Sequence, residues 1–445
     1  MPETRSEPAQ PEPKGSLTRV RRALALVRGA LDLPVAVRLW DGSVEPLGAG
    51  QVRATLCLNA PGVVPSLLRY PSLDRLIRHY AQGRIDLEGG TLLDVAGPLA
   101  LDREARRRLK ALRWPLLRTL APLALARGEP IEPARAFEGD AEGQSRRQGD
   151  NRRFIGFHYD VGNDFYALFL DPQMQYSCAY FPDESTDLAT AQHAKLDMIC
   201  RKLRLRPGER FLDIGCGWGG LLRHAVRHYG VVGHGVTLSE EQRSLALARA
   251  EAEGLSDRIT IELCDYASLE GRFDKIASVG MAEHVGLANL PAYFAKMRAL
   301  LAEDGLFLNH AITRRAKRGR GWRRARFSAR PEQRALQRYI FPGGELDDIG
   351  ATVAAMERAG FEVHDVEGWR RHYERTTREW CERLTTRRAE AEALVGPEAY
   401  RLWVAYLAGC SLAFRRGSAR IFQTVASHSA RGTPPLPPTR ADLYR

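Results

Sequence analysis

The segment that says most about the fold of this chain is residues 211–220, Phe-Leu-Asp-Ile-Gly-Cys-Gly-Trp-Gly-Gly. A Pro207-Gly208 turn precedes it, it opens as a short apolar run, and a helical pattern follows from Leu221 to Tyr229. A nucleotide-type cofactor requires this order of strand, glycine-rich turn and helix, because the glycines permit a tight turn and a close approach of the ligand to the main chain. The stretch therefore predicts a cofactor site at the end of a strand.

The spacing of the aspartate and the glycines in this loop indicates which kind of cofactor it binds. Asp213, Gly215, Gly217 and Gly219 follow the pattern Asp-x-Gly-x-Gly-x-Gly. This spacing is typical of S-adenosylmethionine (SAM) methyltransferases and not of dinucleotide dehydrogenases. The chain has no Gly-Lys-Ser/Thr to hold phosphates, which excludes a P-loop. At the strand end, the Asp213 carboxylate can bind a cationic amine or a hydroxyl.

The next two strands predict the rest of the cofactor pocket. Strand 231–237 ends at Thr237, and Gln242 follows it, at the place where many SAM enzymes have an acid for the ribose hydroxyls. Both side chains can hydrogen-bond the same groups. Asp265 and Tyr266 follow strand 259–263, where an adenine amine and ring face are usually bound. The alternative is that Thr237 and Gln242 are a strand end and a first helical turn without a ligand.

Strands alternate with helices over most of the chain. The predicted strands are 210–214, 231–237, 259–263, 274–279, 305–311, 361–367 and 419–426. The predicted helices are 217–229, 240–253, 290–302, 346–359 and a block over 373–416. This alternation predicts an α/β fold, a Rossmann-like class I SAM methyltransferase domain whose seven-stranded parallel sheet is doubly wound.

Composition divides the 445 residues into five segments. We expect a disordered tail over 1–17, a smaller α+β domain over 18–127, a polar linker over 128–153, the SAM-dependent catalytic domain over 154–428 and a flexible tail over 429–445. The smaller domain opens with an amphipathic helix over 20–31 and contains two short alternating segments, 35–39 and 51–58, and a helix over 73–82.

The chain is basic, with 66 Lys and Arg against 54 Asp and Glu and a formal net charge of +12. This charge indicates anionic partners such as nucleic acid or an acidic membrane face. The seven scattered cysteines include no C-x-x-C pair, which argues against a disulfide framework and favours a reducing, cytoplasmic environment. The N-terminus lacks a secretory signal pattern, and no run approaches the ~20 apolar residues that a membrane-spanning helix needs. We expect a cytoplasmic protein, peripheral on the inner face of the membrane.

Further stretches carry a resemblance to a known family. They are His158–Phe181, Leu212–Gly220, Ser278–Gly286, His310–Ile312, Arg338–Gly344, His372–Tyr373 and Phe422–Val425. Together they resemble the cyclopropane-fatty-acyl-phospholipid synthase family, which includes the mycolic acid cyclopropane synthases and related C-methyltransferases. The resemblance covers about residues 154–427. The segment Tyr80–Gly89 is similar, less specifically, to the family's small lipid-associated N-terminal domain.

This resemblance implies transfer of a methylene from SAM to a cis double bond of a phospholipid acyl chain. An alkene is a poor nucleophile and attacks only a strong electrophile such as the sulfonium methyl. The attack leaves a carbocation, and a base must then remove a proton from the new methyl so that the ring closes. In this family the base is a bound bicarbonate. Its cage maps here onto Cys178, Glu283, His310, Ile312 and Tyr373.

The resemblance also implies a role for each cage residue. Glu283 would accept from the bicarbonate hydroxyl, His310 and Tyr373 would donate to its oxygens, and Cys178 and Ile312 would contribute mainly backbone groups. The first of the matching stretches adds further residues to the site. Tyr159 and Ser177 are assigned to the cofactor pocket, and the faces of Tyr159, Tyr176 or Phe181 could stabilise the cation.

The resemblance implies an unsaturated phospholipid as substrate and an anionic membrane surface as partner, and leaves a homodimer open. For single residues, a purely structural role stays open as an interpretation. Cys178 alone is more often a small buried residue, and His310 a satisfied core histidine. Glu283 could mark an ordinary helix start. It is the five cage residues together, each in its motif, that favour the functional interpretation.

A metal site is a further alternative. Glu283, His284 and His310 could hold an ion in place of an anion cage. The i, i+4 pair His224 and His228 lies elsewhere, on the helix after the glycine loop, and no acid cluster accompanies it. We therefore predict that the protein has no metal site.

The chain departs from the family between Ile312 and Tyr339. Residues 313–337 are longer than is usual and hold an arginine-rich block, 314–330, with Trp322 and Phe327 interleaved. Nucleic-acid binding is one interpretation. Binding of bilayer phosphates with aromatic anchors is another and suits a phospholipid substrate better. A solvated surface insertion is the third. The insertion leaves acyl-chain selectivity and product identity open.

Three other functions remain as alternatives. Within the family, the product could be a methyl branch without ring closure. An RNA methyltransferase could grip its substrate through the arginine-rich block, although the chain lacks both the Asn/Asp-Pro-Pro-Tyr/Phe motif of base-amine methylation and the cysteine pair of RNA cytosine enzymes. A lipid-binding module with a vestigial SAM site is disfavoured by the intact 213–219 loop. We expect no nucleic-acid partner.

Overall fold

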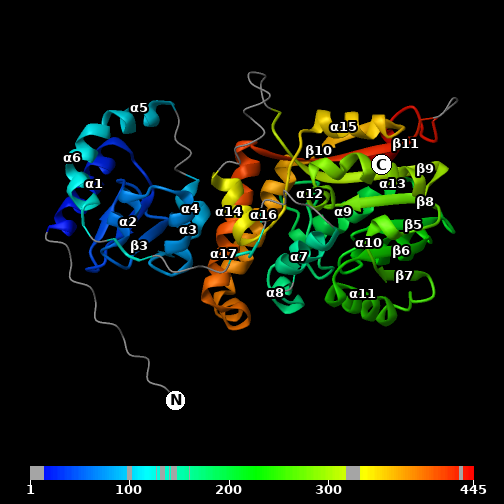
Figure 1. Cartoon of the computed structure of the whole chain (residues 1–445), viewed down its shortest axis with the longest axis horizontal. Helices are drawn as coiled ribbons and strands as arrows, with labels where there is room; N and C mark the ends of the chain where they lie inside the picture. Colours follow the sequence, from blue (N-terminus) through cyan, green and yellow to red (C-terminus); the bar gives the residue numbers. More distant parts are fainter. Residues whose placement is uncertain are drawn as a thin grey trace, which may run out of the picture. The chain divides into compact units, whose positions relative to one another are not determined.

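The computed structural model describes residues 15–97, 103–126, 128–130, 136–139, 141, 148–159, 161–316, 331–429 and 434–444. The chain forms two compact units, coloured along the sequence in Figure 1. One comprises Met1–Arg135 with Gly396–Ala405, and the other comprises Ala136–Val395 with Tyr406–Arg445. Most of the predicted N-terminal tail, and residues 317–330 of the arginine-rich block, lie outside the described residues.

The first unit is built on a four-stranded sheet of order β2-β1-β3-β4, in which β1 and β3 are parallel and the other pairs antiparallel. Its elements are α1 Ser16–Ala30, β1 Val35–Arg38, β2 Val44–Pro46, β3 Ala54–Leu58, α2 Val63–Arg69, α3 Leu73–Ala81, β4 Ile85–Glu88, α4 Leu92–Ala96, α5 Arg103–Ala111 and α6 Arg113–Ala124. Val35 and Val37 of β1 pack with Val20 of α1 and Leu123 of α6 in one core.

A segment from far along the chain completes this unit. Helix α17, Arg388–Arg416, is kinked at Gly396, whose φ of 81° lies in the left-handed region, and its stretch Gly396–Ala405 belongs to the first unit. Ala405 packs against the core of that unit, and Arg401 forms an ion pair with Asp86 at 2.7 Å. The first unit is therefore discontinuous in sequence.

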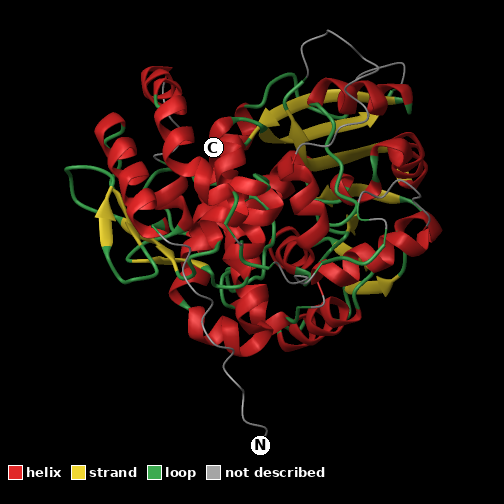
Figure 2. Cartoon of the chain, turned by 60° about the vertical axis from the view of Figure 1, so that its left-hand side comes forward, coloured by secondary structure: helices red, strands yellow, loops and turns green. Residues whose placement is uncertain are grey.

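The second unit is built on a seven-stranded sheet of order β10-β11-β9-β8-β5-β6-β7, drawn in yellow among the helices in Figure 2. Its strands are β5 Arg210–Ile214, β6 Val232–Thr237, β7 Ile259–Leu263, β8 Phe273–Val279, β9 Leu301–Arg314, β10 Phe361–Gly368 and β11 Ala419–His428. Its helices are α7 Gln148–Tyr159, α8 Asn163–Ala167, α9 Leu188–Leu203, α10 Gly220–Tyr229, α11 Glu240–Ala252, α12 Ala282–Val285, α13 Leu290–Leu300, α14 Pro331–Tyr339, α15 Ile349–Arg358, α16 Arg370–Thr386 and the flanking parts of α17.

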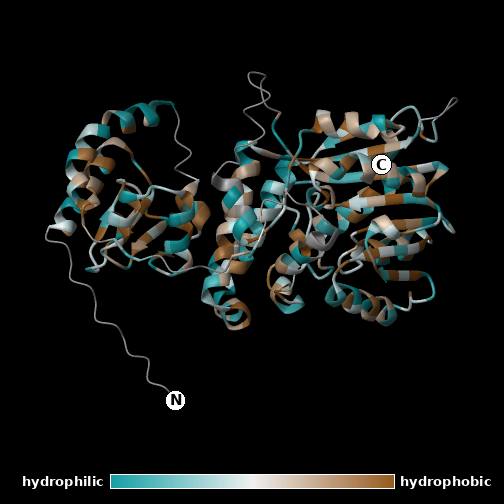
Figure 3. Cartoon of the chain, in the orientation of Figure 1, coloured by the Kyte–Doolittle hydropathy of each residue, from teal (hydrophilic) through white to brown (hydrophobic). Residues whose placement is uncertain are grey.

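The pleat of the strands explains why helices cover both faces of this sheet. Successive side chains of a strand point to opposite faces. Phe211 and Ala277 accordingly pack into the core formed with α9, α10 and α11, whereas Leu212 and Ile276 pack into the core formed with α13 and α15. Figure 3 shows apolar residues in brown along the strands and hydrophilic residues in teal on helix α11. The prediction of a doubly wound, Rossmann-like sheet is confirmed, with one refinement: β11 runs antiparallel to both of its neighbours.

Two local differences from the sequence-based expectations have clear physical reasons. The helix predicted from residue 217 begins at Gly220, because Gly215, Gly217 and Gly219 all have left-handed φ values, 73°, 53° and 72°, that extend the turn. The segment predicted as a flexible C-terminal tail ends in a packed turn, Ala441–Tyr444, in which Leu443 is buried beside the core cluster of β11.

Among the described residues, no helix has both the length and the apolar character needed to cross a bilayer.

Candidate active site

Most of the residues predicted to bind the cofactor line one pocket in the second unit. It lies where the parallel strands β5, β6, β7 and β8 end, the usual ligand-binding edge of an open α/β sheet. Nine of the ten residues predicted for the cofactor line it, namely Tyr159, Ser177, Asp213, Gly215, Gly217, Thr237, Gln242, Asp265 and Tyr266. Gly219 does not. It caps α10, and a Cβ there would lie 3.1 Å from the Cβ of Ala246, so this glycine serves the packing of α10 against α11.

The glycine loop keeps the pocket open. The N–H groups of Gly215 and Cys216 both donate to the carbonyl of Val236, at 2.9 and 3.0 Å, which ties the end of β5 to β6. Gly215 has a φ of 73°, and a Cβ at this position would lie 2.4 Å from Sδ of Met281, a residue that also lines the pocket. The position therefore requires glycine both for its backbone conformation and for space.

A buried carboxyl and a buried amine face the pocket. Burial raises the pKa of Asp213 to about 7, against the opposing effect of Lys195. Burial lowers the pKa of Lys195 to about 8, against the charges of Asp171, Cys178 and Asp213. Lys195 Nζ donates to Gln175 Oε1 at 2.5 Å and to Ser177 Oγ at 2.9 Å. It thus fixes the polar wall opposite the glycine loop.

Lys195 is a pocket residue that the sequence analysis missed. It is 1% exposed, and it lies on α9 one turn after Ala191, on the same buried face as Leu188 and Leu196. A lysine on the apolar face of an amphipathic helix is the signal that could have identified it, because lysine is almost never fully buried unless it is paired.

Thr237 and Gln242 bond to each other. Thr237 Oγ1 donates to Gln242 Oε1 at 2.9 Å, and both side chains are buried. Ser239 Oγ caps α11 by accepting from the Gln242 N–H at 3.3 Å. Gln242 and Thr237 therefore lie at the end of β6 as the sequence indicates, and their contact with a ribose stays a prediction.

The five cage residues come from separate segments and meet in the structure. Glu283 of α12 accepts through Oε1 from the Ile312 N–H at 2.6 Å, and His310 lies two residues before Ile312 on β9. The His310 ring is 5.3 Å from the ring of Trp369. Cys178, Ile312 and Tyr373 pack in one cluster with the same tryptophan.

Two polar atoms of this cage are buried without a hydrogen-bond partner, Glu283 Oε2 and His310 Nε2. The other ring nitrogen of His310, Nδ1, is 3.2 Å from Nε2 of Gln423. An amide nitrogen can only donate, so Nδ1 accepts and the ring proton lies on Nε2. The cage thus offers one unpaired acceptor or acid, Glu283 Oε2, and one unpaired donor, His310 Nε2–H. An unpaired buried polar atom lowers the stability of the folded protein by about 1–3 kcal/mol unless a ligand or water binds it.

Burial also sets the protonation of the cage. It raises the pKa of Glu283 to about 7, against the bond from Ile312. It lowers the pKa of His310 well below its usual range, with Lys195 and Lys202 adding to the effect. It raises the pKa of the Tyr373 hydroxyl and of the Cys178 thiol. At neutral pH the cage therefore holds a neutral histidine, a phenol and a thiol, which suits an anion held by hydrogen bonds.

Of the three aromatic residues predicted to stabilise the cation, two line the pocket and one does not. Tyr159 and Tyr176 line the pocket, with ring centroids 6.2 Å apart and planes almost perpendicular. Phe181 does not line it. Its ring is covered by the guanidinium of Arg375 at 4.0 Å, so it already has a cationic partner.

The metal alternative at Glu283, His284 and His310 is not met, because within the described residues these three side chains do not gather ligand atoms. All seven cysteines are free. At the start of the arginine-rich block, Arg314 lies 3.6 Å from Asp347 and 3.7 Å from Asp348. The arginines at 318, 320, 323, 324, 326 and 330 lie outside the described residues.

Comparison with known proteins agrees with this geometry. The family model described as mycolic acid cyclopropane synthetase matches residues 146–424. A probable fatty acid methyltransferase of Pseudomonas putida is 38% identical over 422 residues, which cover 94% of this chain and 98% of that protein. The cyclopropane-fatty-acyl-phospholipid synthase of Escherichia coli (strain K12) is 40% identical over 270 residues, 61% of this chain and 66% of that protein.

A solved structure extends the likeness to the fold. The crystal structure of mycolic acid cyclopropane synthase CmaA1, complexed with SAH and CTAB, matches with a TM-score of 0.58 and 32% identity, over 62% of this chain and 97% of that one. The glycine loop and the strand-end pocket described above lie within the residues that the family model matches. The chain belongs to the mycolic acid cyclopropane synthetase family and is a SAM-dependent methyltransferase of the cyclopropane synthase type.

Proposed function

We propose that this enzyme converts a cis double bond in an acyl chain of a phospholipid into a cyclopropane, with bicarbonate as the base. The observation that carries the proposal is the pair of buried, unpartnered atoms Glu283 Oε2 and His310 Nε2, beside Tyr373. A hydroxyl-bearing anion has both the acceptors and the donor that this pair lacks. Bicarbonate, when bound there, supplies a base for the proton of the transferred methyl.

The reaction needs a wall without competing nucleophiles. SAM, when bound, would supply an electrophilic methyl: as the alkene carbon bonds to it the S–CH3 bond would break, releasing S-adenosylhomocysteine and leaving a cation on the neighbouring carbon. Cys178 is 0% exposed, and the raised pKa of its thiol keeps it protonated, so it does not trap the cation. Tyr159 and Tyr176 present ring faces and edges to the same pocket, which can stabilise the cation by up to ~2 kcal/mol when desolvated.

The chain's own residues then set the outcome. The Glu283 carboxylate, anchored by the Ile312 N–H, is positioned to accept from the hydroxyl of the anion and so to orient it. His310 Nε2–H and the Tyr373 hydroxyl donate to its oxygens. Loss of a proton from the new methyl lets its electron pair close the three-membered ring. If that proton is not removed, a hydride shift moves the cation along the chain, and loss of a proton from a neighbouring chain carbon gives a methyl-branched alkene.

A second candidate is methylation of the acyl chain without ring closure. The name of the P. putida protein, a probable fatty acid methyltransferase whose likeness covers nearly the whole chain, favours it. The E. coli protein, named for cyclopropane formation, matches a shorter stretch at slightly higher identity. Because the five predicted cage residues lie close together, which supports ring closure, we favour the ring.

SAM with a fully deuterated methyl group separates the two candidates. The enzyme is incubated with vesicles of a cis-unsaturated phospholipid, and the released acyl chains are analysed by mass spectrometry. A cyclopropane retains two deuteriums, whereas a methyl branch retains three. An exocyclic methylene also retains two, so proton NMR must find the upfield ring protons. Mainly triply deuterated chains would show that the product is the branch.

We propose that the protein acts at an anionic membrane surface on the cytoplasmic side. The net charge of +12 and the arginine-rich block support this. Co-sedimentation should be stronger with anionic than with zwitterionic vesicles and should weaken with salt, as the Debye length falls from ~10 Å at 0.1 M to ~3 Å at 1 M. Neutralising four arginines of the block should reduce it. Loss of RNA binding with vesicle binding unchanged would favour a nucleic-acid partner instead.

A further inference from the structure

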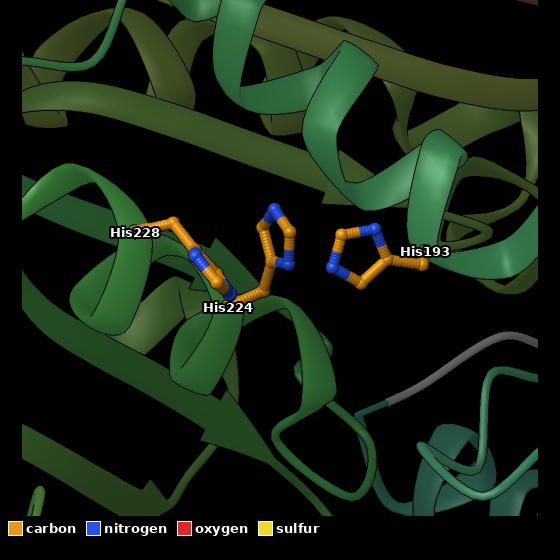
Figure 4. A group of neighbouring side chains, drawn as sticks. All are labelled: His193, His224 and His228. Carbon is orange, nitrogen blue, oxygen red and sulfur yellow. The ribbon is translucent and has the colours of Figure 1, made fainter. Parts of the chain in front are cut away.

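Three histidines from two helices meet outside the cofactor pocket. His193 lies on α9, and His224 and His228 lie one turn apart on α10. Their ring centroids are 4.8 Å (193 to 224), 5.8 Å (193 to 228) and 4.6 Å (224 to 228) apart. One ring nitrogen of each lies within 4.8 Å of the others, and Figure 4 shows the three rings gathered together.

The middle of this cluster has an unsatisfied buried nitrogen. His224 is 7% exposed, and its Nε2 has no hydrogen-bond partner. His193 and His228 are exposed, so an ion can reach the cluster from solvent. The carboxylate of Asp197 is close by, with its Oδ1 3.8 Å from that Nε2. Tyr229 donates to the same oxygen at 2.6 Å, which fixes the carboxylate beside the histidines.

We propose that His193, His224 and His228 bind a divalent transition-metal ion of the zinc class, with Asp197 as the neighbouring negative charge. Imidazole nitrogens are ligands that zinc, copper, nickel and cobalt favour, whereas magnesium and calcium require more oxygen ligands than this cluster offers. Three protein ligands leave one tetrahedral position for water.

The geometry needs only a small closure. A Zn–N bond of about 2.0–2.1 Å places two tetrahedral nitrogens about 3.3 Å apart. The observed spacing of up to 4.8 Å therefore has to shrink by roughly 1.5 Å, which rotation about the histidine side-chain bonds can supply. His224 and His228 already share one face of α10, because residues four apart on a helix are neighbours.

This proposal departs from the sequence-based prediction that the protein has no metal site. The i, i+4 pair was visible in the sequence, but the third ligand lies 31 residues earlier and on a different helix. The nearby acid is likewise brought in by folding, since Asp197 follows His193 by one turn of α9. None of the three histidines lines the cofactor pocket, so the proposal stands independently of the proposed reaction.

The metal would join two helices that serve the pocket. α9 carries Lys195 into it, and α10 begins directly after the glycine loop. An ion held by His193 on one helix and His224 and His228 on the other would cross-link them outside the pocket. The protein should therefore gain thermal stability with added ion, because a ligand that binds only the folded state stabilises it by RT ln(1 + [L]/Kd).

The test uses the full-length, metal-free protein without a histidine tag. Titration with Co²⁺ should give visible d–d absorption at one equivalent, without a thiolate charge-transfer band, and calorimetry should give one Zn²⁺ site. His193→Gln and His228→Gln, both at exposed positions, should each weaken Zn²⁺ binding at least ~10–100-fold, the loss that even an outer-shell substitution causes. His364→Gln, on β10 and outside the cluster, is the matched control and should bind as the wild type does.

Several results would overturn the proposal. The wild-type protein could show no stoichiometric cobalt spectrum, or a spectrum with thiolate bands that places the ion on cysteines. Either variant could bind Zn²⁺ as tightly as the control. The cobalt spectrum of the wild type needs no substitution, so the test does not depend on how a variant folds, and circular dichroism verifies the fold of each variant used.

Discussion

The strand-end pocket and the proposed anion cage share one unit but are built in different ways. The loops that follow β5, β6, β7 and β8 form the centre of the pocket, and Tyr159, Ser177 and Lys195 from other segments complete its wall. The cage is formed by five side chains from four distant segments, all turned inward. The pocket is shaped mainly by backbone conformation, and the cage by buried polar side chains.

This difference predicts how each region fails. A pocket that depends on backbone shape should lose its ligand when a side chain fills it. A cage that depends on buried charges should keep the cofactor and lose turnover. Five predictions test this separation, beginning with the change that should cost most.

Gly215→Val should abolish SAM binding while the protein stays folded. The new side chain would meet Met281, and valine disfavours the φ of 73° at this position. Calorimetric titration with SAM and with its demethylated product measures the loss. Gly208→Val is the matched control, because Gly208 also has a positive φ, 83°, but has open space around it and does not line the pocket. Unchanged affinity in a folded Gly215→Val protein would remove the cofactor assignment.

Glu283→Gln should lower turnover by ~10²–10⁴-fold, the usual cost of losing a positioned acid or base, and leave SAM affinity near that of the wild type. The amide can still accept from the Ile312 N–H but cannot carry the charge that orients the anion. Turnover of the wild type should also fall in bicarbonate-depleted buffer. If Glu283→Gln and the wild type turned over at the same rate, the cage would have no role in the reaction.

The rate should rise with pH through about 7, because burial raises the pKa of Glu283 to about 7 and the carboxylate is the form that accepts. The slope should approach tenfold per pH unit on the acid side. A pH–rate profile at fixed bicarbonate concentration measures it, and Glu283→Gln should lack this limb. A profile that is flat between pH 6 and 8 would contradict the assignment.

The raised pKa of Glu283 also predicts how the stability of the protein changes with pH. The folded protein holds the Glu283 proton more tightly than the unfolded chain, so its contribution to stability is lost as pH rises from the ordinary value of 4.5 to about 7. Glu283→Gln should therefore gain stability relative to the wild type over that window, measured by chemical denaturation at several pH values.

Cys178→Ala should have the smallest effect, with turnover within about tenfold of the wild type. The thiol is buried, burial raises its pKa, and its Sγ donates to the backbone carbonyls of Ala179 and Trp369 at 3.3 and 3.8 Å. A covalent role for the thiol would instead cost orders of magnitude, as loss of an activated nucleophile does. Steady-state kinetics on lipid vesicles distinguishes the two.

The contrast between the regions also explains what sequence could reveal. The strands 210–214 and 259–263 were predicted to the residue, because short apolar runs between turn signals are local patterns. The pocket was equally readable, since Asp213 to Gly219 is contiguous. The cage has no local pattern of its own, and Cys178, Glu283 and Tyr373 could be assigned only through the family resemblance.

What the sequence could not supply was the tertiary neighbourhood of single residues. Lys195 became a pocket residue only when α9 was packed against β8 and β9, and His193 became a neighbour of His224 only when α9 met α10. Phe181 was expected at the cation but is covered by Arg375 from α16. Each of these depends on which faces of two elements meet.

The kinked helix α17 has a consequence for how this protein is made. The first unit needs Ala405 in its core and Arg401 beside Asp86, yet the ribosome adds these residues after some 260 others have followed Arg135. At ~5–20 residues per second, the nascent unit waits for tens of seconds with that surface uncovered. The unit whose synthesis begins first is thus completed only near the end of the chain, and a gene truncated after the N-terminal segment would encode an unfinished fold.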